Sequence, residues 1–244
     1  MGLREFRTEL PSTQTEALRR ARAGAPSGTT VVARRQTAGR GRLDHAWASP
    51  EGGLYLSMIL RAPTQNRALL PLAVGARIAR ALADRYGIHP VVKWPNDLLV
   101  VDGRRARKLA GILTDEVDST TLGRAAVVGV GLNVSTPIGA FPTELAGRVV
   151  TLQELVREPP SLDALEEVVV AAIESAADGL DSPGLVPAIL EECRAALHGV
   201  GRRATVDGTL TGVIRALGDE GELWLATREG PVAVRAGDLV VEEA

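Results

Sequence analysis

Two glycines and two arginines stand together at Gly39-Arg40-Gly41-Arg42, in a polar stretch that follows a strand-like segment. Glycine lets the backbone approach a ligand closely, and guanidinium groups offer forked donors to a carboxylate or a phosphate. Trp47 follows five residues later, in a chain with only three Trp, two Tyr and two Phe. An indole in a polar loop suits stacking on a nucleotide base. The segment predicts an anion-binding loop with a stacking platform, although Gly-Arg-Gly-Arg alone is also typical of a solvated basic loop.

The chain contains only two lysines, Lys93 and Lys108, beside 26 arginines. Arginine replaces a solvated lysine easily, so a retained lysine predicts a place where a compact ammonium is needed and a planar guanidinium does not fit. Lys108 opens a strand-like run in which Gly111 lets a ligand or another backbone approach. Chance retention of the two lysines is the alternative.

Two further segments place polar groups beside apolar ones. The run Lys93-Trp94-Pro95-Asn96-Asp97 ends a strand in an abrupt turn, which gathers an ammonium, an amide and a carboxylate. An ordinary turn between two strands, with Trp94 packed, is the alternative. Asn133 lies within an apolar run, where an unpaired amide would cost ~1–3 kcal/mol, so it is expected to meet a specific partner.

Periodicity and turn residues predict an α+β fold. Helices are predicted at residues 13–23, 67–86, 151–157, 162–180 and 185–197, and strands at 29–34, 54–60, 91–94, 98–101, 109–117 and 125–134. Thr13 with Glu16 suggests a capping box, and Ser161 and Ser182 are predicted N-caps. Residues 36–53 form a long polar loop and residues 135–148 a mobile one. Short strands at 203–207, 210–217, 222–227 and 231–234 predict a small SH3-like β-barrel, which divides the chain into domains of residues 1–198 and 199–244.

Composition restricts the class of protein. The 244 residues, 45% hydrophobic, suffice for one substantial core and a small module. The 28 basic and 30 acidic residues give a net charge of -2, so a nucleic-acid partner is not expected. We predict a cytoplasmic protein, because no leader-like segment and no apolar run of about 18 residues occurs. Cys193 is the single cysteine, which excludes an intrachain disulfide, and it is predicted to be a half-buried helix residue.

In order and spacing, four motifs of this sequence resemble those of bacterial biotin protein ligases. They are Gly39-Arg40-Gly41-Arg42 with Trp47, Lys93-Trp94-Pro95-Asn96-Asp97, Lys108-Leu109-Ala110-Gly111-Ile112-Leu113 and Gly129-Val130-Gly131-Leu132-Asn133. The resemblance covers nearly the whole chain and implies a mixed β-sheet flanked by helices, like that of class II aminoacyl-tRNA synthetases, followed by the SH3-like module. The winged helix-turn-helix of the repressor ligases is expected to be absent, because the biotin-site residues begin at Ser12. DNA binding is expected to be absent with it.

The resemblance also assigns roles. It implies that biotin is contacted by Ser12, Thr13, Gln14, Gln36, Arg40, Gly41, Arg42, Lys108 and Gly111. It places ATP or the adenylate against Arg40, Arg42, Trp47, Lys93, Asn96, Asp97, Lys108, Asn133, Arg148 and Arg235, and the catalytic work on Lys108, Arg42 and Lys93. The family commonly has Gly and Arg where this chain has Asp44 and His45, so it is open whether His45 replaces a phosphate contact of that arginine.

The implied activity joins biotin to ATP as biotinyl-5′-AMP and passes the biotinyl group to a lysine of another protein. Two anions must react, so the site needs fixed cations and Mg²⁺, whose ligands stay unassigned. The implied acceptor is the biotin carboxyl carrier protein domain of a biotin-dependent carboxylase, and homodimers occur in the resembling family. The alternatives are a lipoate or octanoate ligase or transferase, and a non-catalytic sensor of biotinyl-adenylate.

Overall fold

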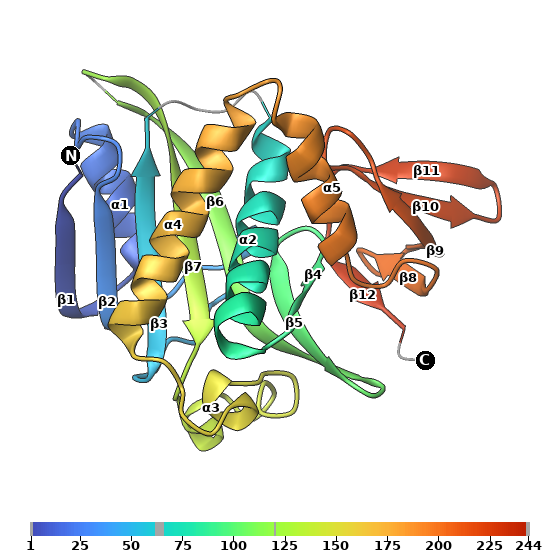
Figure 1. Cartoon of the computed structure of the whole chain (residues 1–244), viewed down its shortest axis with the longest axis horizontal. Coiled ribbons are helices and arrows are strands. Elements are labelled where there is room, and N and C mark those ends of the chain that lie inside the picture. Colours follow the sequence, from blue (N-terminus) through green and yellow to red (C-terminus); the bar gives the residue numbers. More distant parts are fainter. Residues whose placement is uncertain (1, 62–65, 120, 243–244) are drawn as a thin grey trace.

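A mixed seven-stranded sheet forms the centre of the computed structural model, which describes residues 2–61, 66–119 and 121–242 (Figure 1). Its strand order is β1-β2-β3-β7-β6-β5-β4. The strands are β1 (Arg4–Leu10), β2 (Thr30–Gln36), β3 (Gly53–Leu60), β4 (Val91–Lys93), β5 (Asp97–Asp102), β6 (Arg105–Ser119) and β7 (Gly123–Asn133). β1 and β2 are parallel and the other neighbours antiparallel, which confirms the predicted mixed sheet. β1 was not predicted.

Helices cover both faces of this sheet (Figure 1). One face carries α2 (Leu70–Tyr86), α4 (Leu162–Leu180) and α5 (Val186–Ala196), and the other carries α1 (Thr13–Arg22). In α2 the apolar residues Val74, Ile78 and Leu82 recur every four positions and are fully buried. Gly87 ends α2 with a left-handed φ of 67°, directly after the end predicted for this helix. The face that carries only α1 leaves room for the site described below.

The helix caps correct part of the sequence prediction. Ser12 is the N-cap of α1 and accepts a backbone N–H, so the capping box of Thr13 and Glu16 is wrong. Ser161 caps α4 as predicted, whereas α5 begins too far beyond Ser182 for that residue to cap it. The helix predicted at 151–157 is reduced to α3 (Leu152–Leu155).

The C-terminal strands form a second, five-stranded antiparallel sheet in the order β11-β10-β9-β8-β12. They are β8 (Arg203–Val206), β9 (Leu210–Leu217), β10 (Leu223–Thr227), β11 (Gly230–Val234) and β12 (Leu239–Val241), of which β12 was not predicted. β11 and β12 are the two edges and do not pair within the described residues, so the closed barrel that we predicted is not found.

A single buried cluster continues from the large sheet into the small one. Trp94 is 1% exposed within it, and its Nε1 donates to the carbonyl of Gly221 at 2.9 Å. The alternative in which Trp94 packs is therefore confirmed. Cys193 is fully rather than half buried, and burial raises the pKa of its thiol to about 12. No helix of the described residues is both long and apolar enough to cross a membrane.

Candidate functional site

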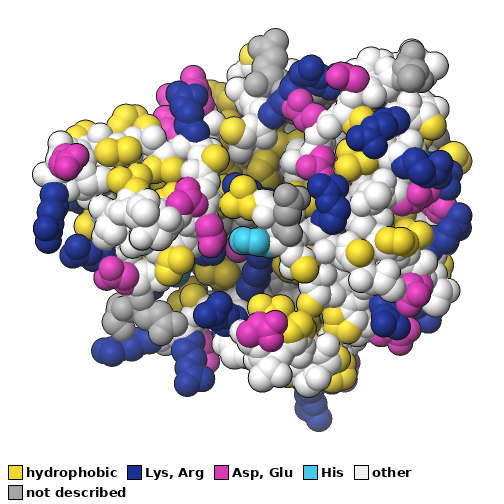
Figure 2. Space-filling view, turned by 180° about the vertical axis from the view of Figure 1, so that it is seen from behind, with side chains coloured by type: hydrophobic (Ala, Val, Ile, Leu, Met, Phe, Trp, Pro, Cys, Tyr) yellow, Lys and Arg dark blue, Asp and Glu magenta, His cyan; other side chains and the backbone are white. Residues whose placement is uncertain are grey.

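A pocket lies at the N-terminus of α1, on the side of the large sheet that α1 covers. Figure 2 shows this side of the molecule hollowed near its middle, with basic side chains in and around the hollow. Most of the predicted site residues line the pocket: Ser12, Thr13, Gln14, Gln36, Arg40, Gly41, Arg42, Trp47, Asn96, Asp97, Lys108 and Gly111. Four others do not line it: Lys93, Asn133, Arg148 and Arg235.

The floor of the pocket is a chain of hydrogen bonds that begins at α1. The backbone N–H and the hydroxyl of Thr13 both donate to Gln36 Oε1, at 2.7 and 3.1 Å. Gln36 Nε2 in turn donates to the hydroxyl of Ser49 at 2.7 Å. This sharing fixes the amide of Gln36, so that its orientation is set before any ligand arrives.

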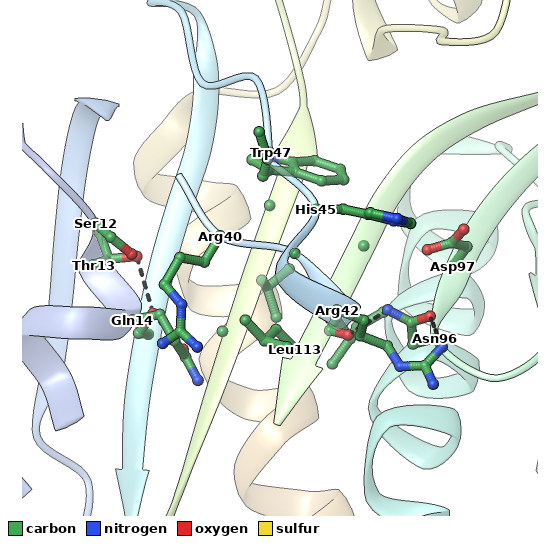
Figure 3. A pocket seen from close by; sticks show the side chains of 18 of the residues that line it. Ser12, Thr13, Gln14, Arg40, Arg42, His45, Trp47, Asn96, Asp97 and Leu113 are labelled. Atoms are coloured by element: carbon green, nitrogen blue, oxygen red, sulfur yellow. Dashed lines mark hydrogen bonds between the residues drawn. The ribbon is translucent and has the colours of Figure 1, made fainter. Parts of the chain in front are cut away.

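The same chain continues through a residue that the sequence prediction missed, Ser57. Its hydroxyl lies 2.9 Å from that of Thr13 and donates to Gln14 Oε1 at 3.0 Å. Gln14 Nε2 donates to Asp115 Oδ2 at 3.2 Å, and Arg40 Nη1 donates to the same oxygen at 3.3 Å. Figure 3 shows Gln14 and Arg40 side by side. The sequence could have indicated Ser57, because it is the one polar residue inside an otherwise hydrophobic strand.

Trp47 lies over a pair of glycines on the sheet. Gly111 of β6 and Gly131 of β7 are paired across the two strands. A Cβ at Gly131 would stand 2.5 Å from Trp47 Nε1, and one at Gly111 would stand 2.9 Å from Trp47 Cζ3, so no side chain fits at either position. The indole N–H of Trp47 is buried without a hydrogen-bond partner among the described residues.

A β-bulge turns Lys108 toward the pocket. The register between β5 and β6 shifts between Leu98 and Leu99, so that Leu99 pairs with Lys108 and Leu98 with Ala110. Leu109 and Ala110 are consequently both buried in the core, although they are neighbours on one strand. Without the extra residue Lys108 would share the core side with Ala110.

The register of β6 with β7 begins at Ala110, so the backbone of Lys108 pairs with another segment instead. Its N–H donates to the carbonyl of Arg148 at 2.7 Å, and its carbonyl accepts the N–H of Val150 at 3.0 Å. The same carbonyl accepts from Asn133 Nδ2 at 3.2 Å, while Asn133 Oδ1 is buried without a partner among the described residues. The end of the loop at 135–148 is thus bonded directly to the backbone of Lys108.

Asp97 pairs with both lysines of the chain. Its Oδ1 lies 2.7 Å from Lys108 Nζ, and its Oδ2 lies 3.5 Å from Lys93 Nζ. Lys93 Nζ also donates to the carbonyl of Leu239 at 3.0 Å, in the C-terminal sheet. Lys108 Nζ also stands 4.9 Å from the centre of the Trp47 ring, within the range of a cation–π contact.

Arg42 lies beside Asn96 and also contacts the C-terminal part of the chain. Its Nη1 lies 3.3 Å from the carbonyl of Gly237 and 3.5 Å from Asn96 Oδ1 (Figure 3). Asn96 Nδ2 donates to the carbonyl of Ile112 at 2.8 Å, which fixes the turn before β5. Asp238, which lies between β11 and β12, also lines the pocket. The pocket therefore joins a polar floor, a flat aromatic ring and several cations.

Residues 7–133 of the chain match the model of the biotin/lipoate A/B protein ligase family. The chain belongs to this family. Among curated relatives, the bifunctional ligase/repressor BirA of Bacillus subtilis (strain 168) is 34% identical over 235 residues, which cover 94% of this chain and 71% of that protein. The biotin--[acetyl-CoA-carboxylase] ligase of Mycobacterium tuberculosis is 30% identical over 241 residues, covering 94% of this chain and 85% of that protein. The solved structure of biotin protein ligase from Aquifex aeolicus in complex with biotin and ATP matches with a TM-score of 0.83 and 27% identity, over 99% of both chains.

In this member of the biotin/lipoate ligase family, the loop bends sharply after Arg42. The backbone turns at Leu43 with a left-handed φ of 52°, which residues with a Cβ rarely adopt. The turn is closed by a hydrogen bond of 2.7 Å from the N–H of Gly41 to the carbonyl of His45. His45 lines the pocket, and its imidazole extends toward Asp97 (Figure 3). Whether His45 takes over a phosphate contact stays a prediction.

Two residues assigned through the family resemblance lie apart from the pocket. Arg235 forms an exposed ion pair with Glu220 at 2.8 Å, beside Trp224. Arg148 is exposed and reaches the site only through its backbone carbonyl. The structure therefore does not bring the Arg235 or Arg148 side chains to the other site residues.

Proposed function

We infer that the protein is a biotin protein ligase, which forms biotinyl-5′-AMP from biotin and ATP and transfers biotin to a lysine of another protein. The observation that carries this inference is the position of Lys108. Its ammonium stands between Asp97 and the indole of Trp47, in the same pocket that Thr13 and Gln14 line. The similarity to a biotin ligase that binds biotin and ATP supports it over the full length.

The two ends of the pocket suit the two substrates. We assign the floor of Ser12, Thr13, Gln14 and Gln36 to the ureido ring of biotin, because amide and hydroxyl groups there can complement its N–H and C=O groups. We assign Trp47 and Asn133 to adenine. The unpaired Oδ1 of Asn133 offers an acceptor for an exocyclic amine, and the Trp47 ring offers a flat face for stacking. Arg40, Gly41, Arg42 and Lys108 then lie nearest the reacting carboxylate and phosphate.

The first step requires two anions to meet. A carboxylate oxygen of biotin attacks the α-phosphorus of ATP, and the bond from that phosphorus to the pyrophosphate oxygen breaks. Lys108, Arg40 and Arg42 reduce the repulsion and stabilise the charge that develops on the α-phosphate. In the second step the neutral amine of the acceptor lysine attacks the acyl carbon, AMP departs, and the amine releases a proton.

We propose that Mg²⁺ enters with ATP and neutralises phosphate charge. The described residues contain no group of three His, Cys, Asp or Glu side chains that could cage a metal. This fits Mg²⁺, which is commonly held by substrate phosphates and one or two carboxylates. Asp238 lines the pocket and would be the carboxylate that holds the ion, since Asp97 is already engaged by two lysines.

We propose that the acceptor is a biotin carboxyl carrier protein domain of a carboxylase. Relatives from Mycobacterium tuberculosis and Paracoccus denitrificans are biotin--[acetyl-CoA-carboxylase] ligases. The acceptor must be another protein, because Lys93 and Lys108 are the only lysines of this chain. Dependence on ATP and on a carboxylase favours the cytoplasm as the place of action.

Exchange of labelled pyrophosphate into ATP tests the proposal, with biotin, lipoate and octanoate offered separately. Exchange with biotin alone, followed by biotin transfer to a purified carrier domain, is the expected result. Exchange with lipoate or octanoate instead of biotin would identify a lipoate or octanoate ligase. Tight biotin and ATP binding without exchange would identify a sensor and overturn the proposed activity.

A further inference from the structure

We propose that Asp97 is an internal counter-ion, which holds Lys108 until the acidic substrates displace it, and that Lys93 is a positioning residue that makes this displacement possible. The proposal rests on the proposed function. Its starting point is the bridge in which one carboxylate serves both lysines, with Oδ1 on Lys108 at 2.7 Å and Oδ2 on Lys93 at 3.5 Å.

Asp97 is well placed to act on the lysines rather than on a ligand. It is 8% exposed and begins β5, where its backbone pairs with Lys93 on one side and with Gly111 on the other. Its two carboxylate oxygens are directed to the two ammonium groups. An anionic ligand group, such as a phosphate, would be repelled by this carboxylate unless a cation lay between them.

Lys93 and Lys108 differ in what else they contact. Lys93 is anchored on the carbonyl of Leu239 and does not line the pocket. Lys108 lines the pocket and stands over Trp47, and besides Asp97 its ammonium has no hydrogen-bond partner among the described residues. An ammonium has three donors, so Lys108 can turn toward a carboxylate or a phosphate while Lys93 stays in place.

Moving Lys108 from Asp97 to the substrates has an energetic cost, which Lys93 lowers. If Lys108 turned to the substrates and Asp97 had no other partner, a largely buried carboxylate would be left uncompensated, which is strongly unfavourable. Lys93 already lies on the other oxygen, and a small movement would shorten its contact. Lys93 therefore lowers the free energy needed to release Lys108, although it does not touch the substrates.

This arrangement predicts opposite effects from removing the two partners. In Asp97→Asn no carboxylate competes with the substrates for the Lys108 ammonium, so biotin and ATP should bind equally well or more tightly. The kcat should fall, because Asp97 no longer orients Lys108. In Lys93→Met the remaining pair of Asp97 with Lys108 tightens, so substrate binding should weaken and kcat/KM should fall. A general loss of structure would lower binding in both variants.

A double-mutant cycle in pyrophosphate exchange tests the proposal. Lys93→Met should lower kcat/KM about tenfold in the wild-type chain but less than about twofold in the Asp97→Asn background, because coupled neighbours are non-additive. Glu220→Gln, which removes an exposed carboxylate paired with Arg235, is the control and should match the wild type. Equal losses in both backgrounds would overturn the proposal, since Lys93 would then act without Asp97.

The Mg²⁺ requirement supplies a second readout. A counter-ion role predicts that Asp97→Asn leaves the Mg²⁺ concentration for half-maximal exchange unchanged. A rise of about tenfold in that concentration, on the scale of losing a metal ligand or its support, would make Asp97 a metal-binding residue and overturn the proposal. If the wild-type chain itself shows no biotin-dependent exchange, the proposed function fails and not this inference alone.

Discussion

Gly111 and Gly131 face each other across β6 and β7, and the indole of Trp47 rests on the bare backbone between them. The ring can pack there because neither glycine has a side chain that would occupy its space. Its place on the sheet therefore depends on residues that have no functional group.

Replacing Gly131 by Ala should displace the ring, because the new methyl group would lie 2.5 Å from the indole. Base stacking on an aromatic ring is worth ~1–3 kcal/mol, so we expect the KM for ATP to rise about tenfold while biotin binding changes little. Gly184→Ala is the matched control, since a Cβ there meets nothing within 4 Å. An unchanged KM for ATP in Gly131→Ala would contradict the stacking role.

Replacing Lys108 by Arg should nearly abolish biotinyl-adenylate formation, although the charge is kept. The ammonium fits between Asp97 and the Trp47 ring, where a wider, planar guanidinium would push one reactant aside. A misplacement of about 1 Å can cost roughly 10²-fold in rate. Single-turnover adenylation measures the effect, and circular dichroism checks the fold. A rate within about threefold of the wild type would refute the role of Lys108.

Residues 135–148 should become more protected from hydrogen exchange when biotin and ATP are added. Their last residue, Arg148, is bonded to the backbone of Lys108, so a ligand that fixes Lys108 also restrains this loop. The strands of the C-terminal sheet serve as the internal reference. Equal protection of the loop with and without ligands would exclude it as a cover for the adenylate.

Replacing Trp94 by Phe should destabilise the protein more than replacing Trp224 by Phe. Trp94 is fully buried and donates to the carbonyl of Gly221, so its loss leaves a buried acceptor unpaired at a cost of ~1–3 kcal/mol. Trp224 is 36% exposed and bonds to Glu222, and its replacement should change the free energy of unfolding by less than about 0.5 kcal/mol. Denaturant unfolding compares the two, and equal effects would show that the indole bond does not hold the sheets together.

The free energy of unfolding should fall as the pH drops below the ordinary histidine pKa of about 6.5. His198 lies where the two sheets meet, and burial, then Arg202 and Lys93, lower its pKa. The unfolded chain therefore binds a proton at a higher pH than the folded one, so stability is present above about pH 6.5 and is lost toward the lower pKa of the folded state. Denaturant unfolding of His198→Gln should show a shallower pH dependence. A pH dependence in His198→Gln as steep as that of the wild type would contradict this role of His198.

The site residues that could be predicted from the sequence are those whose residue type is itself informative. Trp47, Lys108 and the glycines stood out because an indole, an ammonium and a missing side chain are rare or costly at such places. β1 escaped prediction because Arg4–Leu10 is an exposed edge strand with no alternation of apolar residues. The prediction of a closed barrel failed because turn spacing predicts strands but not whether the two edge strands, here β11 and β12, pair with each other.

Relationships between distant residues were not predictable. Regular alternation along β6 would put Lys108 on the core side, and only the bulge opposite Leu98 and Leu99 reverses it. A bulge depends on how two strands align, which neither strand encodes alone. The same holds for Lys93, whose attachment to Leu239 depends on how the C-terminal sheet docks.

Both lysines of the chain are bonded to one carboxylate beside the pocket. A biotinyl-adenylate that escapes from the pocket is an acylating agent for any accessible amine, including those of the protein that made it. Arginine, which occupies every other basic position, is a poor nucleophile because its guanidinium stays protonated. The surface of this protein is thus chemically resistant to its own product, and lysine side chains introduced on that surface would become sites of self-labelling.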